Sequence, residues 1–599
     1  MNAANSMTAT SAAQGFSGQI ALEVKDVSKT FHLGARQVQA LQQVSFRVRQ
    51  GVVTGLVGPD AAGKTTLMRL AAGLLLADTG SISILGKDAA TQSLEVQGAI
   101  GYMPQRFGLY EDLTVQQNLD LYADLQGVPR SARAARYREL LHMAGLAPFT
   151  KRLAGQLSGG MKQKLGLACA LVRQQSLLLL DEPTVGVDPL SRRELWDIVY
   201  RLVRGQGTSV LLTTAYLDEA ERCDEVVLLH DGRVLDQGTP AALREIMRGR
   251  TYEIDVADLE KRTLQTRLAD APGVLDALIQ GERIRVVMES TAPPDLAVLL
   301  PGMSGIEMKP VAPRFEDSFV SLLKAGSRAG DADPGQMAAA MPAPPIQAGA
   351  PVIEVNNLQC RFGNFYAVKN ISFSVGKGEV FGLLGANGAG KSTTFRMLCG
   401  LLPPSGGTLR VAGADLRRAA AAARARIGYM SQKFSLYGQL SVAENLRFFS
   451  STYGLSGKRR ASRINWALQE FELSAMADFS SGDLSLGYKQ RLALACALMH
   501  EPEILFLDEP TSGVDPLARR EFWTRINALA ARGVTIMVTT HFMEEAEYCD
   551  RLAIMAQGEI LTMGTPASIK ARAHSAGLSE PTMEDAFVAL IKAHEQEAA

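Results

Sequence analysis

The sequence has no surplus of charge of either sign, and this absence bears on its partners. Lys plus Arg number 62, and so do Asp plus Glu, among the 599 residues. A chain without a net basic field has no general attraction to nucleic acid or to an anionic membrane surface. We therefore expect no nucleic-acid partner, and we expect partners to be recognised by shape.

Long apolar runs are also missing. A membrane-spanning helix needs about 18 uninterrupted apolar residues, whereas the run 177–180 ends at once in Asp181 and Glu182. The segment 1–19 contains no Lys or Arg and no apolar core, so we expect a disordered tail rather than a signal peptide. The protein is therefore expected in the cytoplasm, with any membrane role supplied by a partner.

Cysteine is scarce, and no two cysteines have C-x-x-C spacing. Most of them stand in apolar stretches, which favours reduced core residues over a disulfide framework or a zinc site. The hydrophobic content of 47% and the charged content of 21% are ordinary for a globular protein. The six cysteines are Cys169, Cys223, Cys360, Cys399, Cys496 and Cys549.

The chain contains an internal sequence repeat. Gly58-Pro-Asp-Ala-Ala-Gly-Lys-Thr recurs as Gly385-Ala-Asn-Gly-Ala-Gly-Lys-Ser, an offset of 327 residues (385 − 58). The same offset relates Asp181-Glu-Pro-Thr to Asp508-Glu-Pro-Thr, with no insertion between these landmarks. A repeat of this length indicates two copies of one domain, in agreement with a chain too long for a single core.

Each copy holds a glycine-rich loop that is typical of phosphate binding. In the first copy an apolar strand at 52–57 precedes the loop and a helical pattern at 65–76 follows it, the context that G-x-x-x-x-G-K-[ST] requires. The glycines let backbone N–H groups face phosphate oxygens, and the helix N-terminus adds a favourable partial charge. The predicted ATP-binding residues are Gly58, Pro59, Asp60, Ala61, Ala62, Gly63, Lys64, Thr65 and Thr66 in the first copy, and Gly385, Ala386, Asn387, Gly388, Ala389, Gly390, Lys391, Ser392 and Thr393 in the second.

The ends of these loops carry the groups that handle charge. Lys64 and Lys391 are expected to reach the terminal phosphates of ATP, and the hydroxyls of Thr65 and Ser392 are expected to bind Mg²⁺. The alternative is a glycine-rich turn with an incidental lysine. Two copies in register make that alternative negligible.

Paired carboxylates follow one strand-length apolar run in each copy. They stand at the carboxyl end of the run, and the corresponding sheet edge is where α/β proteins bind ligands. Asp181 and Asp508 are expected to hold Mg²⁺ through water, while Glu182 and Glu509 are expected to polarise the attacking water. The alternative is a pair of solvated acids that end a buried strand.

The first copy carries additional residues near its end. The segment from Pro313 resembles the segment from Pro581 at an offset of 268 residues, 59 fewer than 327. The extra residues fall near 251–311, where apolar alternation predicts strands at 252–256 and 283–288. A small α+β appendage is therefore expected after the first copy.

The expected fold class is α/β, with two P-loop NTPase domains in tandem and the small α+β appendage after the first. The stretch between the copies is rich in Ala, Gly and Pro, which predicts a flexible linker. The expected boundaries are 1–19 for the tail, 20–250 for the first domain, 251–324 for the appendage, 325–351 for the linker and 352–599 for the second domain.

A third motif makes the sequence resemble a known family. Leu157-Ser-Gly-Gly-Met-Lys-Gln stands 24 residues before Asp181 (181 − 157), and it resembles the signature sequence of ATP-binding cassette (ABC) proteins. The phosphate loop, a glutamine, the signature, Asp-Glu-Pro and Gly186-Val-Asp-Pro occur in family order in both copies. Within the family, Tyr102-Met-Pro-Gln and Asp218-Glu-Ala-Glu resemble the ATPase subunits of bacterial multidrug or ABC-2-type exporters, which drive separate membrane permeases.

The resemblance implies further site residues. In that family two cassettes close head to tail, so that each ATP is held by one phosphate loop and by the signature of the other copy. It also implies separate transmembrane permease subunits, expected to be two, and a position on the cytoplasmic face of the inner membrane. The implied residues are Ser158, Gly159, Gly160, Ser485 and Gly487 in the signatures, Phe31 and Phe362 against adenine, and Gln105 and Gln432 at the metal and the attacking water.

The two copies differ at two family positions. The family has a histidine after the strand that follows Asp-Glu-Pro; the second copy has His541 there, and the first has Ala215. The second signature carries Leu486 where the first has Gly159, which places a side chain where backbone should approach phosphate. With head-to-tail pairing both changes fall on the site of the first phosphate loop. We therefore expect the second loop's site to hydrolyse ATP and the first loop's site mainly to bind it. The predicted catalytic residues are Glu509, His541, Gln432, Glu182 and Gln105.

Apolar residues at 107–110 and 434–437 follow the two glutamines. In the exporter family this region receives a permease helix, and the alternative is a turn folded into its own core. Twin-cassette proteins that act on ribosomes or DNA form a second class of hypothesis. Ribosome-acting members usually have a charged helical linker and Asn-His-Leu-Asp, where this chain has Ser512-Gly-Val-Asp, so an exporter motor is favoured.

Overall fold

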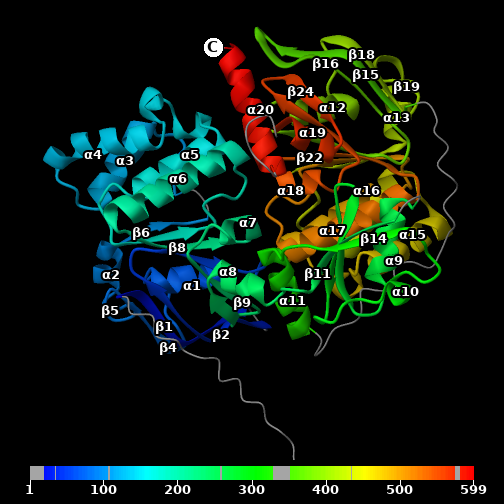
Figure 1. Cartoon of the computed structure of the whole chain (residues 1–599). Coiled ribbons are helices and arrows are strands. Elements are labelled where there is room, and N and C mark those ends of the chain that lie inside the picture. The colour runs from blue at the N-terminus through cyan, green and yellow to red at the C-terminus, as the bar shows by residue number, and fades with distance from the viewer. Residues whose placement is uncertain are drawn as a thin grey trace, which may run out of the picture.

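The computed structural model describes residues 19–33, 36–105, 108–256, 259–327, 351–432, 435–573 and 581–598. Most of the expected tail and of the expected linker lies outside these residues. Figure 1 shows two α/β halves side by side, the first running from blue to cyan and the second from yellow-green to red. Among the described residues, no helix combines the length and apolarity needed to cross a membrane.

The first half is built on two sheets. A six-stranded sheet has the order β10-β9-β3-β8-β7-β6 and is parallel except for β10, and a four-stranded antiparallel sheet has the order β2-β1-β4-β5. Leu22 of the small sheet and Leu56 of the large one lie in the same core cluster. The strands are β1 (Ile20–Leu33), β2 (Arg36–Arg49), β3 (Val53–Val57), β4 (Thr79–Ile84), β5 (Lys87–Asp88), β6 (Ile100–Met103), β7 (Leu177–Asp181), β8 (Ser209–Thr214), β9 (Glu225–His230) and β10 (Arg233–Gly238).

Helices of the first half cover these sheets and include an outlying group. Helices α3 and α4 lie at the far edge of the half in Figure 1, next to α5. The helices are α1 (Lys64–Ala71), α2 (Ser93–Ala99), α3 (Val115–Leu125), α4 (Arg130–Met143), α5 (Gly159–Ala170), α6 (Pro189–Gln206), α7 (Leu217–Ala220) and α8 (Pro240–Glu245).

The second half repeats the design, with sheets β16-β15-β18-β19 and β20-β21-β22-β17-β23-β24. Its strands are β15 (Ile353–Phe362), β16 (Phe365–Val375), β17 (Val380–Gly385), β18 (Gly406–Val411), β19 (Ala414–Asp415), β20 (Ile427–Met430), β21 (Ile504–Asp508), β22 (Thr535–Thr540), β23 (Arg551–Ala556) and β24 (Glu559–Gly564). Its helices are α12 (Lys391–Leu398), α13 (Leu416–Arg424), α14 (Val442–Thr452), α15 (Gly457–Glu470), α16 (Leu486–Ala497), α17 (Pro516–Ala531), α18 (Met543–Ala546), α19 (Pro566–Ala573) and α20 (Met583–Ala598).

The central strands explain where the sites lie. Every residue of β3, β7 and β8 is buried, as is every residue of β17, β21 and β22. Strands of a parallel sheet covered on both faces read as continuous apolar runs, and their carboxyl ends share one edge. Strands β3 and β17 lead into the phosphate loops, and β7 and β21 end at Asp181 and Asp508.

A separate sheet follows the first half. Strands β11 (Thr251–Val256), β12 (Val274–Gln280), β13 (Arg283–Met288) and β14 (Ile306–Pro310) form an antiparallel sheet of order β12-β13-β11-β14. Helices α9 (Lys261–Ala269) and α10 (Leu296–Leu299) complete it. Its core includes Ile254, Leu268 and Ile284, which form a cluster of their own. We call residues 251–311 the appendage.

Helix α11 (Phe315–Ser327) returns to the first half. Phe315, Phe319 and Leu323 recur every four residues on one helix face, and all three are buried in the core of the first half. The apolar face of α11 therefore packs in the first half's core, while its Asp317 and Lys324 are bonded to Arg285 and to the carbonyl oxygen of Leu275 in the appendage sheet.

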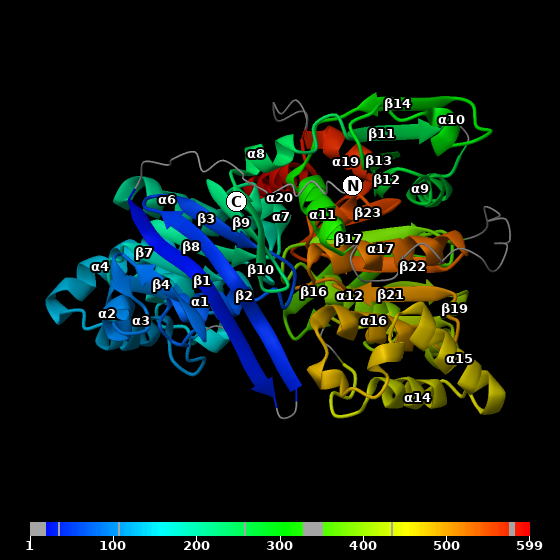
Figure 2. The ribbon, with the colours of Figure 1, turned by 90° about the horizontal axis from the view of Figure 1, so that it is seen from below.

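The helix that ends each half contacts the other half, and the two contacts are reciprocal. Arg193 of α6 is paired with Glu584 and Asp585 of α20, and Arg520 of α17 is paired with Glu316 of α11. Figures 1 and 2 show the appendage, in green, beside α17 of the second half. Each half is therefore held through the helix that begins with its own Asp-Pro, α6 or α17.

Candidate functional site

The phosphate loops have the backbone that their glycines were expected to supply. Gly63 and Gly390 precede the helices with φ of 101° and 103°. A Cβ at Gly58 would stand 2.1 Å from the carbonyl oxygen of Leu229, and one at Gly63 would stand 2.5 Å from that of Ala40. No larger residue fits at these positions without moving backbone.

One residue of the first loop departs from this pattern. Ala61 has φ of 62°, and the equivalent residue of the second loop is Gly388, with φ of 84°. A left-handed conformation costs roughly 1 to 2 kcal/mol for a residue with a Cβ and nothing for glycine. The first loop therefore stores backbone strain that the second loop lacks.

Both loop lysines are buried and face the acidic strand ends. Lys64 Nζ donates hydrogen bonds to the carbonyl oxygens of Gly58 and Pro59, at 2.8 and 3.0 Å, and lies 3.4 Å from Glu182 Oε1. Lys391 Nζ is arranged in the same way and lies 3.6 Å from Glu509 Oε1. Burial lowers the pKa of Lys391, and the neighbouring Glu509 opposes that change.

The expected metal residues come together at the same strand ends. Thr65 Oγ1 donates to Asp181 Oδ1 at 3.2 Å, and Ser392 Oγ donates to Asp508 Oδ1 at the same distance. The other oxygen of Asp181, Oδ2, is buried and has no hydrogen-bond partner among the described residues. A hydroxyl beside a carboxylate with an unpartnered oxygen is a donor set that suits Mg²⁺.

A threonine in each half, which sequence reasoning did not single out, fixes these acids. Thr213 Oγ1 donates to Asp181 at 2.8 Å and accepts from the backbone N–H of Glu182 at 2.8 Å. Thr539 makes the same pair of contacts with Asp508 and Glu509. A threonine at the end of the strand adjacent to Asp-Glu was the signal available in the sequence.

The two glutamates stand in a strained backbone conformation. Glu182 has φ of 50° and Glu509 has φ of 46°, in the left-handed region that residues with a Cβ rarely adopt. Gln105 Nε2 donates to Glu182 Oε2 at 2.5 Å, and Gln432 Nε2 donates to Glu509 Oε2 at 2.7 Å. Strain of this kind persists where the surrounding contacts fix the residue, and it concentrates at functional sites.

The glutamates differ in one neighbour. Thr213 pairs with Asp181 and Thr539 pairs with Asp508 in register, so Ala215 and His541 occupy equivalent places two residues further on. His541 is 1% exposed, and its Nδ1 lies 3.1 Å from Glu509 Oε2. Both ring nitrogens are buried and neither makes a hydrogen bond among the residues that the structure covers, although Nδ1 lies beside the Glu509 carboxylate.

This neighbour sets the charge of Glu509. Burial by itself would raise the pKa of Glu509, but the nearby His541 and Lys391 lower it to about 2. The carboxyl group is therefore ionised at neutral pH. An ionised carboxylate can accept a proton from a bound water or polarise it.

The signature segments differ in how they begin their helices. Ser158 caps α5, since its hydroxyl accepts from the backbone N–H of Met161 at 3.3 Å, whereas Ser485 makes no such bond at α16. The Leu486 side chain extends toward Gly513, because a Cβ at Gly513 would stand 3.2 Å from Leu486 Cδ2.

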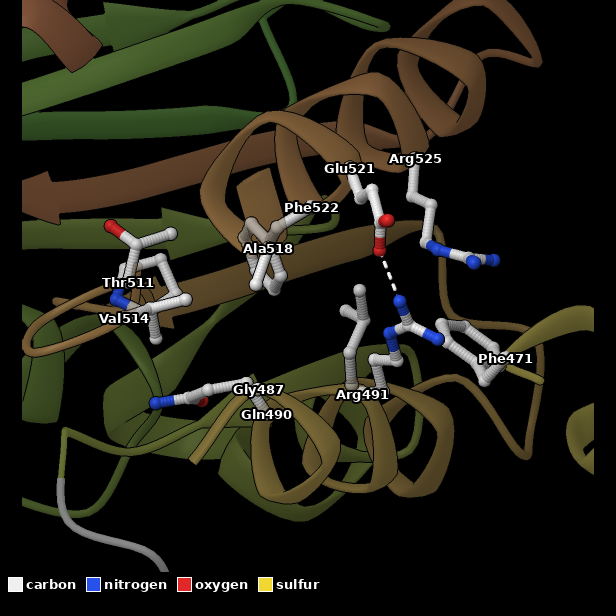
Figure 3. A pocket seen from close by; sticks show the side chains of 12 residues that line it. Phe471, Gly487, Gln490, Arg491, Thr511, Val514, Ala518, Glu521, Phe522 and Arg525 are labelled. Carbon is white, nitrogen blue, oxygen red and sulfur yellow. Dashed lines mark hydrogen bonds and ion pairs between the residues drawn. The ribbon is translucent and has the colours of Figure 1, made fainter. Parts of the chain in front are cut away.

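The second signature helix is fastened to α17. Figure 3 shows α16 and α17 lining a small pocket, with Arg491 of α16 paired with Glu521 of α17. A Cβ at Gly487 would stand 3.3 Å from the Cβ of Ala518, so the two helices lie close at the signature end. The second signature helix and α17 are therefore joined by an ion pair and by close packing.

The loops that end in Asp188 and Asp515 lie between the halves. We call residues 184–188 the first aspartate loop and residues 511–515 the second aspartate loop. Asn387 Nδ2 of the second phosphate loop donates to the carbonyl oxygen of Gly186, in the first aspartate loop, at 3.2 Å. A site on the second phosphate loop is thus contacted by the first half.

The two aromatic residues expected against adenine lie in the small sheets. Phe31 is half-buried in β1, and Lys29 Nζ stands 5.8 Å from its ring centroid. Phe362 ends β15 and is 53% exposed. Neither ring is part of a core cluster. Stacking of Phe31 and Phe362 on adenine stays a prediction.

Comparison with known proteins agrees with this geometry. The family model described as "ABC transporter" matches residues 41–185 and 368–512. "Probable multidrug ABC transporter ATP-binding protein YbhF" of Escherichia coli strain K12 is 50% identical over 552 residues, which cover 92% of this chain and 95% of the relative. The chain belongs to the ABC transporter ATPase family.

The ABC ATPase has shorter relatives as well. "Nod factor export ATP-binding protein I" of Burkholderia orbicola is 44% identical over 218 residues, 36% of this chain and 72% of the relative. A solved "Structure of ATP binding subunit of ABC transporter" is 34% identical and covers 38% of this chain and 92% of that chain, with a TM-score of 0.35. Membership of the family confirms the predicted resemblance, the tandem P-loop fold and the activity: the chain binds and hydrolyses ATP.

The apolar loops after the glutamines are partly exposed in the ABC ATPase. Phe107 and Phe434 lie outside the described residues. Leu109 and Leu436 pack against the cores of their halves, whereas Tyr110 is 58% exposed and Tyr437 is 50% exposed. The loops are thus anchored by their leucines and present their tyrosines.

A buried asparagine holds each of these tyrosines, and sequence reasoning missed both. Asn118 accepts from the backbone N–H of Tyr110 and donates to its carbonyl oxygen, at 3.0 and 3.1 Å. Asn445 does the same for Tyr437 at the same distances. Each asparagine is 0% exposed, so the presentation of the tyrosines is fixed by the fold.

Proposed function

We propose that the chain is the ATP-hydrolysing motor of a bacterial exporter of the multidrug, ABC-2 type, and that it drives separate permease subunits. Two relatives support transport as the role, since their names are those of a multidrug transporter's ATP-binding protein and of an export ATP-binding protein. The Escherichia coli relative is matched over nearly its whole length. The transported substrate is selected by the permease.

We propose that the two halves pair head to tail around each ATP. The hydrogen bond from Asn387 to Gly186 supports this pairing, because it joins the phosphate loop of one half to the aspartate loop of the other. Asp188 of the first half also acts electrostatically on Lys391. Under this pairing the Lys391 site contains Ser158, Gly159 and Gly160 of the first signature.

The proposed division of labour assigns hydrolysis to the Lys391 site. The observation that carries it is the buried, unpartnered Nε2 of His541, whose Nδ1 faces Glu509. A buried ring nitrogen requires a hydrogen-bond partner, and the terminal phosphate of ATP supplies one. At the Lys64 site the equivalent residue is Ala215 and the facing signature carries Leu486, so this site is proposed mainly to bind ATP.

The chemistry at the Lys391 site follows from these contacts. Ionised Glu509 polarises the attacking water and accepts its proton, while Gln432 and His541 keep the carboxylate oriented. Lys391 and the backbone N–H groups of its loop neutralise charge on the terminal phosphates.

The residues present fit one Mg²⁺ at each site. Thr65 with Asp181, and Ser392 with Asp508, would hold the ion, with Gln105 and Gln432 near it. Bound Mg²⁺ neutralises charge on the phosphate oxygens of ATP.

The proposed permease contacts are the loops around Tyr110 and Tyr437. Both rings are exposed on loops fixed by a buried asparagine, which favours recognition of a preformed apolar surface. The two halves offer different surfaces. Phe448 packs edge-on against Tyr437, with 4.7 Å between the ring centroids, whereas the equivalent residue of the first half is Leu121. Two different transmembrane permease subunits, contacted by this chain from the cytoplasmic face of the inner membrane, would suit this difference.

Fractionation of the natural host tests this function. We expect the chain in the membrane fraction, where affinity purification recovers it with polytopic membrane proteins. A double variant, Tyr110→Ser with Tyr437→Ser, is expected to leave the membrane fraction while its ATPase rate stays within about twofold of the parent, because neither ring is in an ATP site. Recovery of the parent chain with ribosomes instead of membranes would refute the proposal.

A further inference from the structure

Two aromatic rings, one from each half, meet beside His541. Tyr216 follows Ala215 in the first half, and Phe542 follows His541 in the second. The ring centroids of Tyr216 and Phe542 lie 5.4 Å apart at an interplanar angle of 48°, within the range of favourable aromatic pairs. Tyr216 is 2% exposed and Phe542 is 5% exposed, so the contact is buried between the halves. The first half therefore reaches the neighbourhood of His541 with a side chain that belongs to neither its phosphate loop nor its signature.

An arginine from each half lies over both rings. The guanidinium carbon of Arg192, on α6, is 4.9 Å from the ring centroid of Tyr216 and 6.0 Å from that of Phe542. The guanidinium carbon of Arg519, on α17, is 4.7 Å from the centroid of Phe542 and 5.6 Å from that of Tyr216. A cation over an aromatic ring is attracted to it, more strongly where water is excluded. Each arginine thus joins a ring of its own half to a ring of the other.

The charge of each arginine is balanced inside its own half. Arg192 Nη1 lies 3.0 Å from Asp218 Oδ2, and Arg519 Nη1 lies 3.6 Å from Glu544 Oε2. Each acid stands two residues after the aromatic residue of the same half. A buried cation is tolerated where an acid pairs with it. The pairing therefore allows the arginines to remain beside the rings at a buried junction.

Phe542 carries the contact on to the histidine. The rings of His541 and Phe542 have centroids 4.2 Å apart at an interplanar angle of 37°. Neither nitrogen of His541 makes a hydrogen bond among the described residues. The orientation of the imidazole therefore depends on the Glu509 carboxylate beside it and on the packing of Phe542. Displacement of Phe542 would change the direction in which His541 points.

The ring of Tyr216, rather than its hydroxyl, is suited to hold Phe542. The hydroxyl is buried and has no hydrogen-bond partner in the part of the chain that the structure describes. A buried hydroxyl without a partner adds no stabilising bond. The equivalent residue of the second half, Phe542, has no hydroxyl at all. Removal of the hydroxyl should therefore leave the contact intact.

We propose that Tyr216 is a positioning residue for His541: its ring holds Phe542 in place, and Phe542 orients the imidazole toward the terminal phosphate at the Lys391 site. This inference rests on the proposed assignment of hydrolysis to that site and deepens it. The half whose own site lacks the histidine supports the histidine of the other half.

Steady-state phosphate release from the purified full chain gives the first test. Tyr216→Leu keeps an apolar side chain but removes the ring, so kcat is expected to fall about tenfold while KM for ATP stays within about twofold, because orientation rather than binding is lost. Tyr216→Phe keeps the ring and is expected to retain kcat within about twofold. Tyr137→Leu makes the same change at another buried tyrosine of the first half, in α4, and is expected to leave kcat within about twofold.

A double-mutant comparison separates positioning from a general structural role. In a His541→Ala chain the histidine is already gone, so the addition of Tyr216→Leu is expected to lower the remaining rate by less than about twofold. Phe542→Leu tests the same contact from the second half, and it is expected to lower kcat about tenfold in the parent and less than about twofold in His541→Ala. A parental kcat in Tyr216→Leu and Phe542→Leu, or the same fall with and without His541, would overturn the inference.

Failure of this inference is distinguishable from failure of the proposed function. Comparison of Glu182→Gln with Glu509→Gln locates hydrolysis without reference to Tyr216. If that comparison assigns turnover to the Lys64 site, the division of labour fails whatever Tyr216→Leu does. If turnover resides at the Lys391 site but the loss in Tyr216→Leu is independent of His541, only the role of Tyr216 fails.

Discussion

At the scale of single residues, the two ATP sites share the loop lysine, the Asp-Glu pair and the glutamine, and they differ at the histidine and at the signature glycine. Glu182 and Glu509 share the left-handed backbone, the bond to a glutamine and the contact with a lysine. Only Glu509 has a histidine beside it. That neighbour, together with Lys391, lowers the pKa of Glu509, and its buried Nε2 is the nitrogen proposed to face the terminal phosphate.

Replacement of this histidine is expected to stop most of the turnover. His541→Ala removes a group that handles charge next to the attacking water, so kcat should fall by about 10² to 10⁴ while KM for ATP changes little. Steady-state phosphate release from the purified chain measures both. Ala215→His is the matched control, and it should change kcat by less than about threefold because Leu486 still disfavours that site. A variant His541→Ala that keeps half of the parental rate would contradict the role of this residue.

Sequence reasoning at this scale recovered the residues whose types are diagnostic. The repeat offset located both lysines and both Asp-Glu pairs without any structure, and the family resemblance with the shared Thr-Thr sequence located the difference between Ala215 and His541. It did not find Thr213 and Thr539, whose hydroxyls hold the acids, because a threonine at the end of a strand has many ordinary uses. Asn118 and Asn445 escaped for a similar reason: their bonds depend on a loop folding back over a helix.

At the scale of elements, α6 and α17 are the places where the halves are fastened. Arg520 of α17 is 8% exposed and is bonded to Glu316 of α11 and Asp276 of the appendage. Arg193 of α6 is 31% exposed and is bonded to Glu584 and Asp585 of α20. Each arginine thus pairs with two acids, and at the less exposed Arg520 one of the two comes from the appendage.

The two arginines are therefore expected to differ in their contribution to stability. Arg520→Ala takes a buried cation away from two partly buried carboxylates and should lower the free energy of unfolding by about 1.5 to 3 kcal/mol. Arg193→Ala breaks a more exposed pair and should cost about 1 kcal/mol or less. Urea titration of the full chain, followed by tryptophan fluorescence, compares them, with Trp523 of α17 close to the first change. Equal losses would contradict the role given to the appendage.

The sequence predicted several strands correctly, but it did not predict which elements pack against one another. Strands were predicted at 252–256 and 283–288, and the structure has β11 at Thr251–Val256 and β13 at Arg283–Met288. In β11 the apolar residues alternate along the strand, whereas β13 is buried along nearly all of its length and was foreseen from its β-branched residues. That α9 would contact α17, more than 250 residues away, has no local signal, because the bond from Asn527 to Gln265 depends on how two separate cores meet.

At the scale of the whole molecule, one chain supplies both halves of the pair, so its two sites can diverge. In a pair of identical cassettes any change would appear in both sites. Here Ala61 and Ala215 belong to the first half and Leu486 to the second, yet under head-to-tail pairing all three fall on the Lys64 site. Retention of Glu182 keeps that site able to contact ATP and its water.

The division of labour between the two sites is tested most directly by neutralising each glutamate in turn and measuring the ATPase rate of the purified full chain. Glu509→Gln is expected to lower the rate by at least about 10², because it removes the carboxylate that polarises water at the complete site. Glu182→Gln is expected to lower the rate by no more than about threefold, since the site on Lys64 already lacks the histidine. Equal losses in the two variants, or a larger loss in Glu182→Gln, would contradict the assignment of hydrolysis to the Lys391 site.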